Sequence, residues 1–187
     1  MPNRTVILDK SKCSLCEKGK PFTSNETSLM RIESNYSFQR LQMDVTYPIE
    51  LTDTSGKQVG YTVSCRDHFS GYAWASVTKK RDAEATKKLL KLVVAEVGIV
   101  PDIVQYDQGS EGRGVFEAYV MEIGSTLVRS AVEHPQSNGG VERWHGIVKP
   151  VWSLLSLGND KPFKENVREG VKQVNETPNS VTKLSPK

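Results

Sequence analysis

The chain has 187 residues, of which 25% are charged and 37% are hydrophobic, and its formal net charge is +3. Its length fits one domain with a short appendage and is sufficient to bury a core. No apolar run approaches the roughly 20 residues that span a bilayer, which excludes an integral membrane protein. The opening segment MPNRTVILDK lacks the apolar stretch of a signal peptide, so we do not expect secretion.

The first part of the chain predicts three consecutive strands. Residues 41–51, 59–67 and 71–78 mix β-branched and aromatic residues with polar ones, a pattern typical of strands. The polar segment 53–58, which contains Asp, Ser and Gly, is typical of a turn between the first two strands. Because the links are short, we expect the three strands to pair antiparallel.

The hydrophobic period changes at residue 82 and predicts a helix over residues 82–98. Asp82 is a typical N-cap residue, and Gly98 is a typical residue at the C-terminal end of a helix. Apolar residues recur at the helical spacing and predict the buried face of this helix. They are Ala85, Leu89, Leu92, Val93 and Val97.

Strands and helices alternate in the rest of the chain. The predicted elements are a strand at 101–107, a helix at 115–123, a strand at 126–129, a long helix from 140 to 157 and a last helix at 163–175. Pro150 is expected to kink the long helix. The order β-β-β-α-β-α-β-α-α predicts an α/β fold, with a mixed five-stranded sheet and helices on its faces.

Three acidic residues occur where acids do not help folding. Asp44 lies within a predicted strand, Asp107 ends another, and Glu142 lies in the first turns of the long helix. Converging carboxylates repel one another and need a cation, and an oxygen-only ligand set suits Mg²⁺ or Mn²⁺. Two such ions about 4 Å apart can assist phosphoryl transfer. The sequence therefore favours a metal-dependent phosphoryl-transfer site.

Each of these acids also has an ordinary explanation. The chain contains 22 acidic residues, and most acids in proteins are solvated surface charges. Asp107 is equally typical of a turn or a cap, and Glu142 is favoured in a first helical turn by the helix dipole. Asp44 is the hardest of the three to explain in this way, although edge strands do tolerate acids.

The motifs around these acids resemble a known family. The segments LQMDVT, YDQGSE and HPQSNGGVERWHG, in this order, are similar to the catalytic core of retroviral and retrotransposon integrases, which are DDE recombinases. Asp107 and Glu142 are separated by 34 residues, close to the family spacing. The resemblance extends over residues 38–186, and the closing segment NETPNSVTKLSP also matches it. After YDQGSE the sequence departs from the family pattern, since Phe116 comes later than expected.

The resemblance implies an RNase H-like fold and a metal-binding catalytic triad of Asp44, Asp107 and Glu142. It implies two bound Mg²⁺ or Mn²⁺ ions and polynucleotidyl transfer in two steps. Water first cleaves a phosphodiester near each end of an element's DNA, and the exposed 3′-hydroxyl then attacks a target phosphate. The implied partners are double-stranded DNA and further copies of the chain, in the nucleus of a eukaryotic host, with no membrane.

Three residues are candidates for DNA contact. Lys149 follows Glu142 by seven positions and returns to the same helical face, where it could hold a phosphate. A solvated helix charge is an equal alternative for Lys149. Gln136 and Asn138 lie in a segment that resembles the flexible active-site loop of the family, which touches DNA. An ordinary polar turn with Asn138 as a helix cap is the alternative.

Other conspicuous residues are expected to play structural parts. His145, three positions after Glu142, is expected to be a polar helix residue and a neighbour of the site. Trp74, Trp144 and Trp152 are expected to pack in the core rather than to stack on bases. His134 is expected to pack the loop that follows it.

A C-x-x-C motif at Cys13 and Cys16 has zinc-ligand spacing. It resembles the second half of the H-H-C-C zinc module that precedes retrotransposon integrase cores. Only twelve residues precede Cys13 and none is His, so we expect an incomplete site without stable zinc. We therefore divide the chain into residues 1–37, a remnant of that module with a linker, and 38–187, the catalytic core. Cys65 is expected to be a buried small apolar residue.

Three functions remain open from the sequence. The first is an integrase or transposase core with an intact triad. The second is a remnant or domesticated integrase-like protein that binds DNA or a partner without catalysis, and the missing histidines favour it. The third is a simple RNase H-like nuclease, against which the NGGVERWHG segment and the cysteine pair both point.

Overall fold

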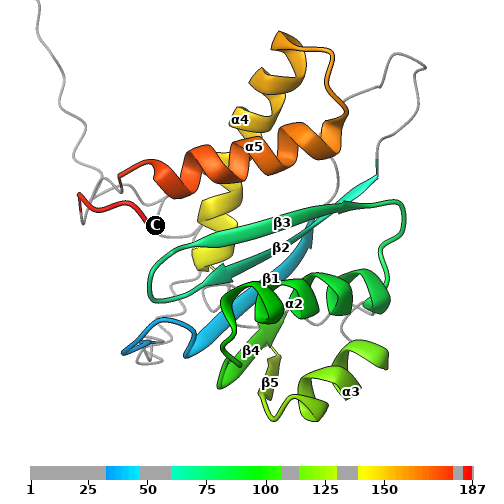
Figure 1. Cartoon of the computed structure of the whole chain (residues 1–187), viewed down its shortest axis with the longest axis vertical. Coiled ribbons are helices and arrows are strands. Elements are labelled where there is room, and N and C mark those ends of the chain that lie inside the picture. The colour runs from blue at the N-terminus through cyan, green and yellow to red at the C-terminus, as the bar shows by residue number, and fades with distance from the viewer. Residues whose placement is uncertain (1–32, 47–59, 107–113, 130–138, 179–182, 187) are drawn as a thin grey trace, which may run out of the picture. The chain divides into compact units, whose positions relative to one another are not determined.

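A computed structural model describes residues 33–46, 60–106, 114–129, 139–178 and 183–186 of the chain (Figure 1). All of them belong to one compact unit, residues 32–187. The elements in chain order are β1 (Arg40–Thr46), β2 (Tyr61–Asp67), β3 (Ala73–Thr78), α2 (Ala83–Val97), β4 (Ile103–Tyr106), α3 (Val115–Glu122), β5 (Thr126–Arg129), α4 (Gly139–Gly158) and α5 (Phe163–Glu176). This order confirms the predicted one.

The strands form one five-stranded mixed sheet in the order β3-β2-β1-β4-β5. β1 pairs antiparallel with β2, and β2 with β3, whereas β1–β4 and β4–β5 are parallel. The mixed sheet predicted from the sequence is therefore confirmed. Within the described residues, no helix is long and apolar enough to cross a membrane.

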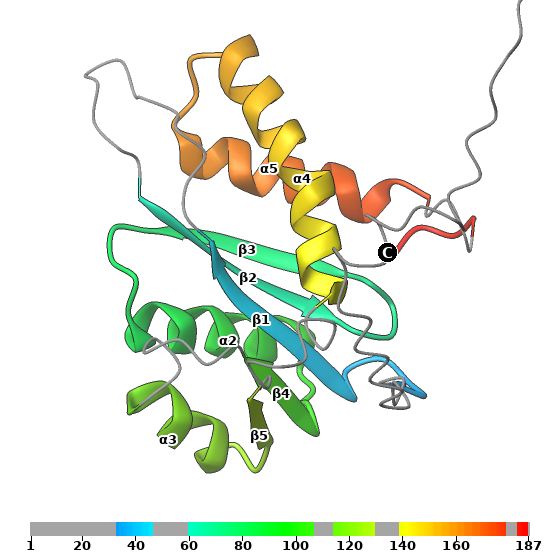
Figure 2. The same cartoon turned by 180° about the vertical axis from the view of Figure 1, so that it is seen from behind.

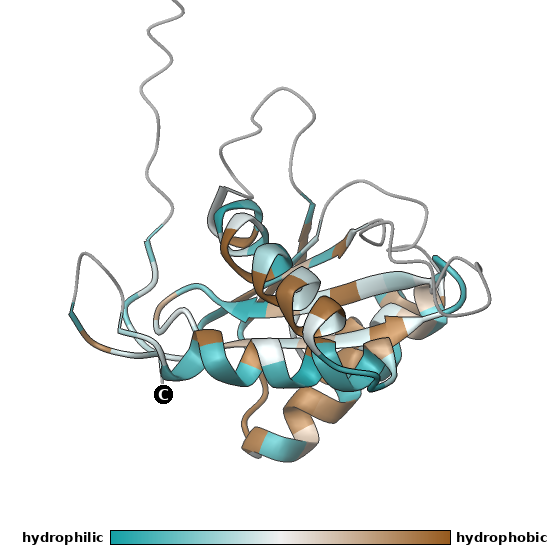
Figure 3. Cartoon of the chain, turned by 90° about the horizontal axis from the view of Figure 1, so that it is seen from above, coloured by the Kyte–Doolittle hydropathy of each residue, from teal (hydrophilic) through white to brown (hydrophobic). Residues whose placement is uncertain are grey.

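The two faces of the sheet carry different residues because side chains alternate along each strand. Leu41, Met43 and Val45 of β1 join a hydrophobic cluster with residues of α2 and α3. Gln42 and Asp44 point to the opposite face, which α4 and α5 cover. The two helix pairs lie on opposite sides of the sheet in Figures 1 and 2. Hydrophobic and hydrophilic stripes on the same helices are visible in Figure 3, as amphipathic helices against a sheet require.

α2 shows how local signals define an element. The Asp82 side chain accepts a hydrogen bond from the Ala85 N–H at 2.9 Å, and Gly98 ends the helix with a left-handed φ of 73°. Both predicted caps are confirmed. The predicted buried face is wrong at Leu92, which is 55% exposed. Thr86, Leu89, Leu90 and Val93 are buried instead, because the apolar stripe is centred closer to Leu90.

The second hydrophobic cluster joins α4 and α5 to β3. Trp144 and Trp152 of α4 meet edge to face, with ring centroids 6.0 Å apart, and both are buried. The Trp152 Nε1–H donates to the carbonyl of Val167 in α5 at 3.1 Å. The expected packing role of these tryptophans is confirmed, and α4 remains helical through Pro150.

Gly170 of α5 lies directly against Trp152, and a Cβ at this position would be 2.5 Å from Trp152 Cδ1. The indole is fixed by its hydrogen bond and cannot yield, so Gly170→Ala is expected to lower the free energy of unfolding by about 1–3 kcal/mol. Urea unfolding measures this change. Gly146→Ala in α4 is the control, because a Cβ there meets nothing within 4 Å, and helix propensity predicts a gain of up to about 1 kcal/mol. Equal stability of the two variants would contradict the packing argument.

Candidate active site

Asp44 lies in the middle of β1 on the sheet face that α4 covers. Its Oδ1 accepts a hydrogen bond from the Val45 N–H at 2.8 Å, and its Oδ2 lies 3.4 Å from Nδ1 of His145. The side chain of Asp44 is 23% exposed, so the carboxylate is held by its neighbours but still reaches solvent. A partly solvated carboxylate fixed in this way is suited to bind a cation.

His145 links α4 to two strands. It is only 5% exposed, and its Nε2 lies 2.7 Å from the Ser64 hydroxyl of β2. Ser64 stands opposite Asp44 in the antiparallel register, and its Oγ also lies 3.2 Å from the Asp44 carbonyl oxygen. If His145 carries its proton on Nδ1, Ser64 donates to Nε2 while Nδ1 faces the carboxylate; we assign this tautomer from the hydrogen-bond pattern. The first turns of α4 are thereby fixed on β1 and β2 (Figure 2).

The pKa of His145 also follows from its position. Burial lowers this pKa to about 4, and the nearby charge of Lys149 acts in the same direction. The Asp44 carboxylate opposes this shift, since it favours the charged imidazolium. At neutral pH the imidazole is uncharged, so it adds no positive charge beside Asp44.

Glu142 and Lys149 flank His145 along α4. Glu142 lies three residues before His145 and Lys149 four residues after it, and such neighbours share one side of a helix. Glu142 is exposed and Lys149 is half-buried. Because His145 touches Asp44, this side of α4 faces the β1 carboxylate. The predicted return of Lys149 to the side of Glu142 agrees with its electrostatic effect on His145.

Asp107, the third predicted acid, lies outside the described residues. It follows Tyr106 directly, and Tyr106 pairs with Met43, the residue before Asp44, in the parallel register of β1 and β4. Among the residues that the structure describes, no group of three His, Cys, Asp or Glu side chains could hold a metal ion. Asp44 and Glu142 are oxygen donors, which fits a divalent cation of the Mg²⁺ type.

The other predicted positions fall into two groups. Gln136, Asn138, His134, Cys13 and Cys16 lie outside the described residues. Cys65 is fully buried, which raises the pKa of its thiol, so its expected role as a small apolar residue is confirmed.

The sequence did not identify His145 as the link between α4 and the sheet. Its only signal was its position three residues after Glu142. Its partner Ser64 is 81 residues away in the chain, so this contact depends on the tertiary fold.

The family model described as "Integrase core domain" matches residues 34–135, which is more than half of the chain. The Pro-Pol polyprotein of Feline foamy virus is 27% identical over 158 residues, which cover 82% of this chain and 13% of the polyprotein. That of Simian foamy virus type 1 is 31% identical over 93 residues, which cover 49% of this chain and 8% of the polyprotein. The chain thus spans a small part of the polyproteins that it matches.

Solved structures show the same fold at low sequence identity. The catalytic core domain of BIV integrase matches with a TM-score of 0.65 and 17% identity, covering 80% of this chain and 91% of that one. The HTLV-2 integrase catalytic core domain in complex with magnesium (trimeric form) gives 0.65 and 18%, covering 80% and 93%. A chain of the simian T-cell lymphotropic virus intasome, in complex with PP2A regulatory subunit B56 gamma, gives 0.66 and 19%, covering 87% and 57%. The fold is therefore that of integrase catalytic cores, which is RNase H-like, as the resemblance implied.

Proposed function

Because this chain belongs to the integrase core domain family, we propose that it carries out polynucleotidyl transfer in DNA integration, as the catalytic core of a retrotransposon or related element. Asp44, Asp107 and Glu142 are the proposed metal-binding triad. The observation that carries the proposal is the contact of His145 with both Ser64 and Asp44, which sets the Glu142 side of α4 against the β1 carboxylate.

The register of the sheet supports the third member of the triad. β1 and β4 run parallel side by side, so their carboxyl ends lie at the same edge of the sheet. Asp44 and Asp107 follow the paired residues Met43 and Tyr106. This register supports the proposal that Asp44 and Asp107 share a cation.

The residues of the chain have separate parts in the proposed reaction. Asp44, Asp107 and Glu142 would hold two Mg²⁺ or Mn²⁺ ions, which when bound polarise the phosphodiester and stabilise the attacking and leaving oxygens. Asp44 is oriented by the Val45 N–H and by His145. Buried His145 holds α4 in register, so that Glu142 keeps its place during the reaction.

The same groups would serve two successive displacements at phosphorus. In the first step a water oxygen forms a new P–O bond, and the bond to the 3′-oxygen breaks. In the second step that 3′-hydroxyl attacks a target phosphate in line: a new bond forms between its oxygen and the phosphorus, and the bond from that phosphorus to the 3′-oxygen of the target strand breaks, which leaves a target 3′-hydroxyl. Both steps require the attacking oxygen to be held close to the phosphorus, which is what a rigid site provides.

The partners follow from the same proposal. We propose double-stranded DNA as substrate and target, with Gln136, Asn138 and Lys149 as DNA contacts, and action in the nucleus. The similar HTLV-2 core is described as trimeric, and the simian T-cell lymphotropic virus chain is part of an intasome. These neighbours support an oligomeric assembly of this chain on DNA.

Calorimetric titration with Mn²⁺ tests the proposed metal site in the full chain. The wild-type chain is expected to bind Mn²⁺, and Asp107→Asn is expected to lose this binding, because the proposed site loses one of its three charged ligands. The titration is repeated with a short DNA duplex present, in case the site is completed by DNA. If the wild-type chain binds no metal at millimolar concentration under either condition, the catalytic proposal fails and DNA binding without catalysis becomes the better reading.

A further inference from the structure

A second group of charged residues lies on the same sheet face as Asp44. Arg40 precedes Asp44 by four residues on β1, Arg66 of β2 stands opposite Gln42, and His68 follows Arg66 by two. Arg40 lies an even number of residues from Asp44, as Arg66 and His68 do from Ser64. Because side chains alternate between the two faces along a strand, these side chains leave the sheet on the side of α4. Arg143 of α4 lies close enough to this group for its charge to lower the pKa of Arg66.

The backbone on both sides of Arg66 leaves space for its guanidinium. Its guanidinium lies between two glycines: a Cβ at Gly71 would be 3.1 Å from Nη2, and a Cβ at Gly140 would be 3.0 Å from Nη1. Gly71 also has a left-handed φ of 81°, which favours glycine. Side chains at either position would occupy the space of the guanidinium, so Arg66 is held at a fixed place beside the start of α4.

The positive charges of this group act on one another. Burial lowers the pKa of His68, and Arg66 and Arg40 lower it further, against the effect of Asp67. Burial also lowers the pKa of Arg66, and so does the charge of Arg143, while Asp67 raises it. Like charges gathered at a partly buried place are unfavourable unless an anion joins them.

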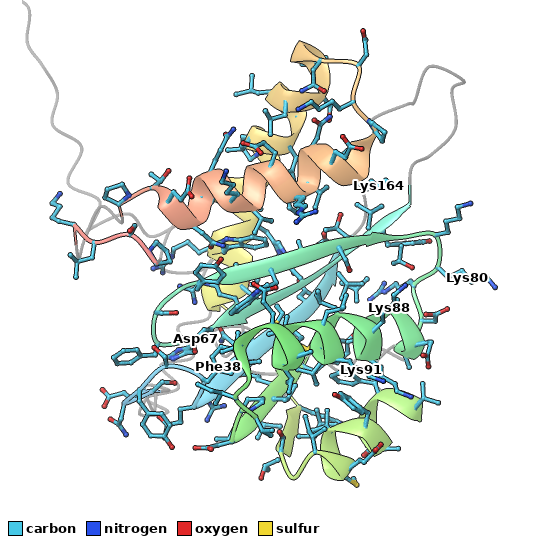
Figure 4. All side chains as sticks on the ribbon, viewed as in Figure 1. Phe38, Asp67, Lys80, Lys88, Lys91 and Lys164 are labelled. Atoms are coloured by element: carbon cyan, nitrogen blue, oxygen red, sulfur yellow. The ribbon has the colours of Figure 1, made fainter. Side chains whose placement is uncertain are left out.

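Asp67, the next residue in the described strand β2, raises the pKa of Arg66 but forms no ion pair with its guanidinium. It lies on the other side of the sheet, where it is 1% exposed and accepts hydrogen bonds from the N–H groups of Phe38 and Ser70 and from the Ser70 hydroxyl (Figure 4). Arg40 donates to the neutral Gln105 side chain at 3.1 Å. In the part of the chain that the structure describes, Arg40, Arg66 and Arg143 form no ion pair with a carboxylate.

We propose that Arg40, Arg66 and Arg143 form a binding site for the phosphates of a DNA strand that passes beside the start of α4, outside the buried Gln42, towards Asp44. Guanidinium groups match phosphate oxygens in geometry and charge. The proposal rests on the proposed function for the identity of the anion, but binding at this site requires no chemical step.

The spacing along β1 defines which phosphates would be bound. At about 3.3 Å per residue, Gln42 and its partner Arg66 lie about 7 Å from Asp44 along the strand, and Arg40 about 13 Å. Successive nucleotides of one DNA strand rise by about 3.4 Å. For a duplex whose axis lies parallel to β1, the site would hold phosphates about two to four nucleotides from the one that reacts at Asp44.

The test measures how salt weakens the binding of the full chain to a short fluorescent DNA duplex, in EDTA so that no catalysis occurs. Each lost phosphate contact reduces the slope of log K against log salt by about 0.9. The double variant Arg40→Gln/Arg66→Gln is expected to reduce the slope by roughly 1–2. Arg143 is exposed, so its replacement is not expected to affect folding. Arg143→Gln is expected to reduce the salt slope by up to about 0.9.

The matched control removes two positive charges elsewhere. Lys88 and Lys91 are exposed on α2, on the other side of the sheet (Figure 4). Lys88→Gln/Lys91→Gln is expected to leave the slope unchanged. If the arginine variants keep the wild-type slope, or if the lysine variant reduces it equally, the proposed site is overturned, since binding is then absent there or is only general attraction to a basic surface.

The experiment separates this proposal from the proposed function. A chain that binds DNA through the arginines but neither binds metal nor transfers strands refutes the catalytic proposal alone. A chain that transfers strands with unchanged rate and salt slope in the arginine variants refutes the phosphate site alone.

Discussion

Asp44→Asn is expected to reduce the rate of metal-dependent DNA strand transfer by roughly 10³-fold or more. The amide still accepts the Val45 N–H, so the local fold is kept, but the negative charge that would bind the cation is lost. Stabilisation of transition-state charge by a bound cation amounts to several kcal/mol, and about 1.4 kcal/mol corresponds to a tenfold change in rate. The rate is measured with a duplex that ends in a free 3′-hydroxyl, in Mg²⁺ and in Mn²⁺.

Two further variants make this result specific. Glu142→Gln is expected to cause a loss of similar size, because it removes the charge of another proposed metal ligand. The Glu142 side chain is exposed and has no part in the core, so the fold is expected to be kept. Glu84→Gln is the control: this residue lies on α2, away from α4, and makes only a 4.0 Å surface ion pair with Lys87. Strand transfer by a folded Asp44→Asn variant at the wild-type rate would remove Asp44 from the proposed site.

The parts of the fold that sequence predicts well are those with local causes. The α2 caps depend on Asp82 bonding three residues ahead and on Gly98 taking a left-handed φ, so the composition of one segment suffices. The order of strands and helices follows from a change in hydrophobic period that is visible in short windows. Leu92 shows what local patterns do not predict. It lies three residues after Leu89, so its spacing fits a position at the edge of the apolar stripe of α2. Only packing against the sheet decides which edge of that stripe is buried, and Leu92 is exposed.

The parts that sequence does not predict arise from pairing between distant segments. Arg66 and Asp67 are adjacent charges in the chain, but the register of β2 sends them to opposite faces of the sheet. Arg40 and Arg143 come to the same face from segments 103 positions apart, so no motif could group them. The resemblance to integrases supplied the triad and not this group.

The contact of His145 with Ser64 also joins distant segments of the chain. Removal of the His145 side chain is expected to affect both stability and activity. His145→Ala deletes a buried side chain and leaves the Ser64 hydroxyl without its 2.7 Å partner, which is expected to cost about 1–3 kcal/mol of unfolding free energy. Because α4 then loses its attachment beside Asp44, Glu142 is displaced, and a shift of 1 Å in such a site can cost roughly 10²-fold in rate. His145→Gln, which offers an amide to Ser64, is expected to recover part of the stability. A variant with wild-type stability and strand transfer would contradict this role of His145.

The low pKa of His145 also predicts how stability responds to acid. The pKa is about 4 in the folded chain, against about 6.5 for a free histidine, so between these values the unfolded chain binds more protons. Stability is therefore complete above about pH 6.5 and falls as the pH approaches 4, by at most about 3 kcal/mol, because Asp44 opposes the shift. Urea unfolding in metal-free buffer near neutral pH and near pH 4 measures this loss, which should be smaller in His145→Gln. His68, whose pKa is also lowered, is present in both chains and cancels in the comparison. An equal acid loss in both chains would mean that His145 is already protonated at neutral pH, as a dominant interaction with the Asp44 carboxylate would require.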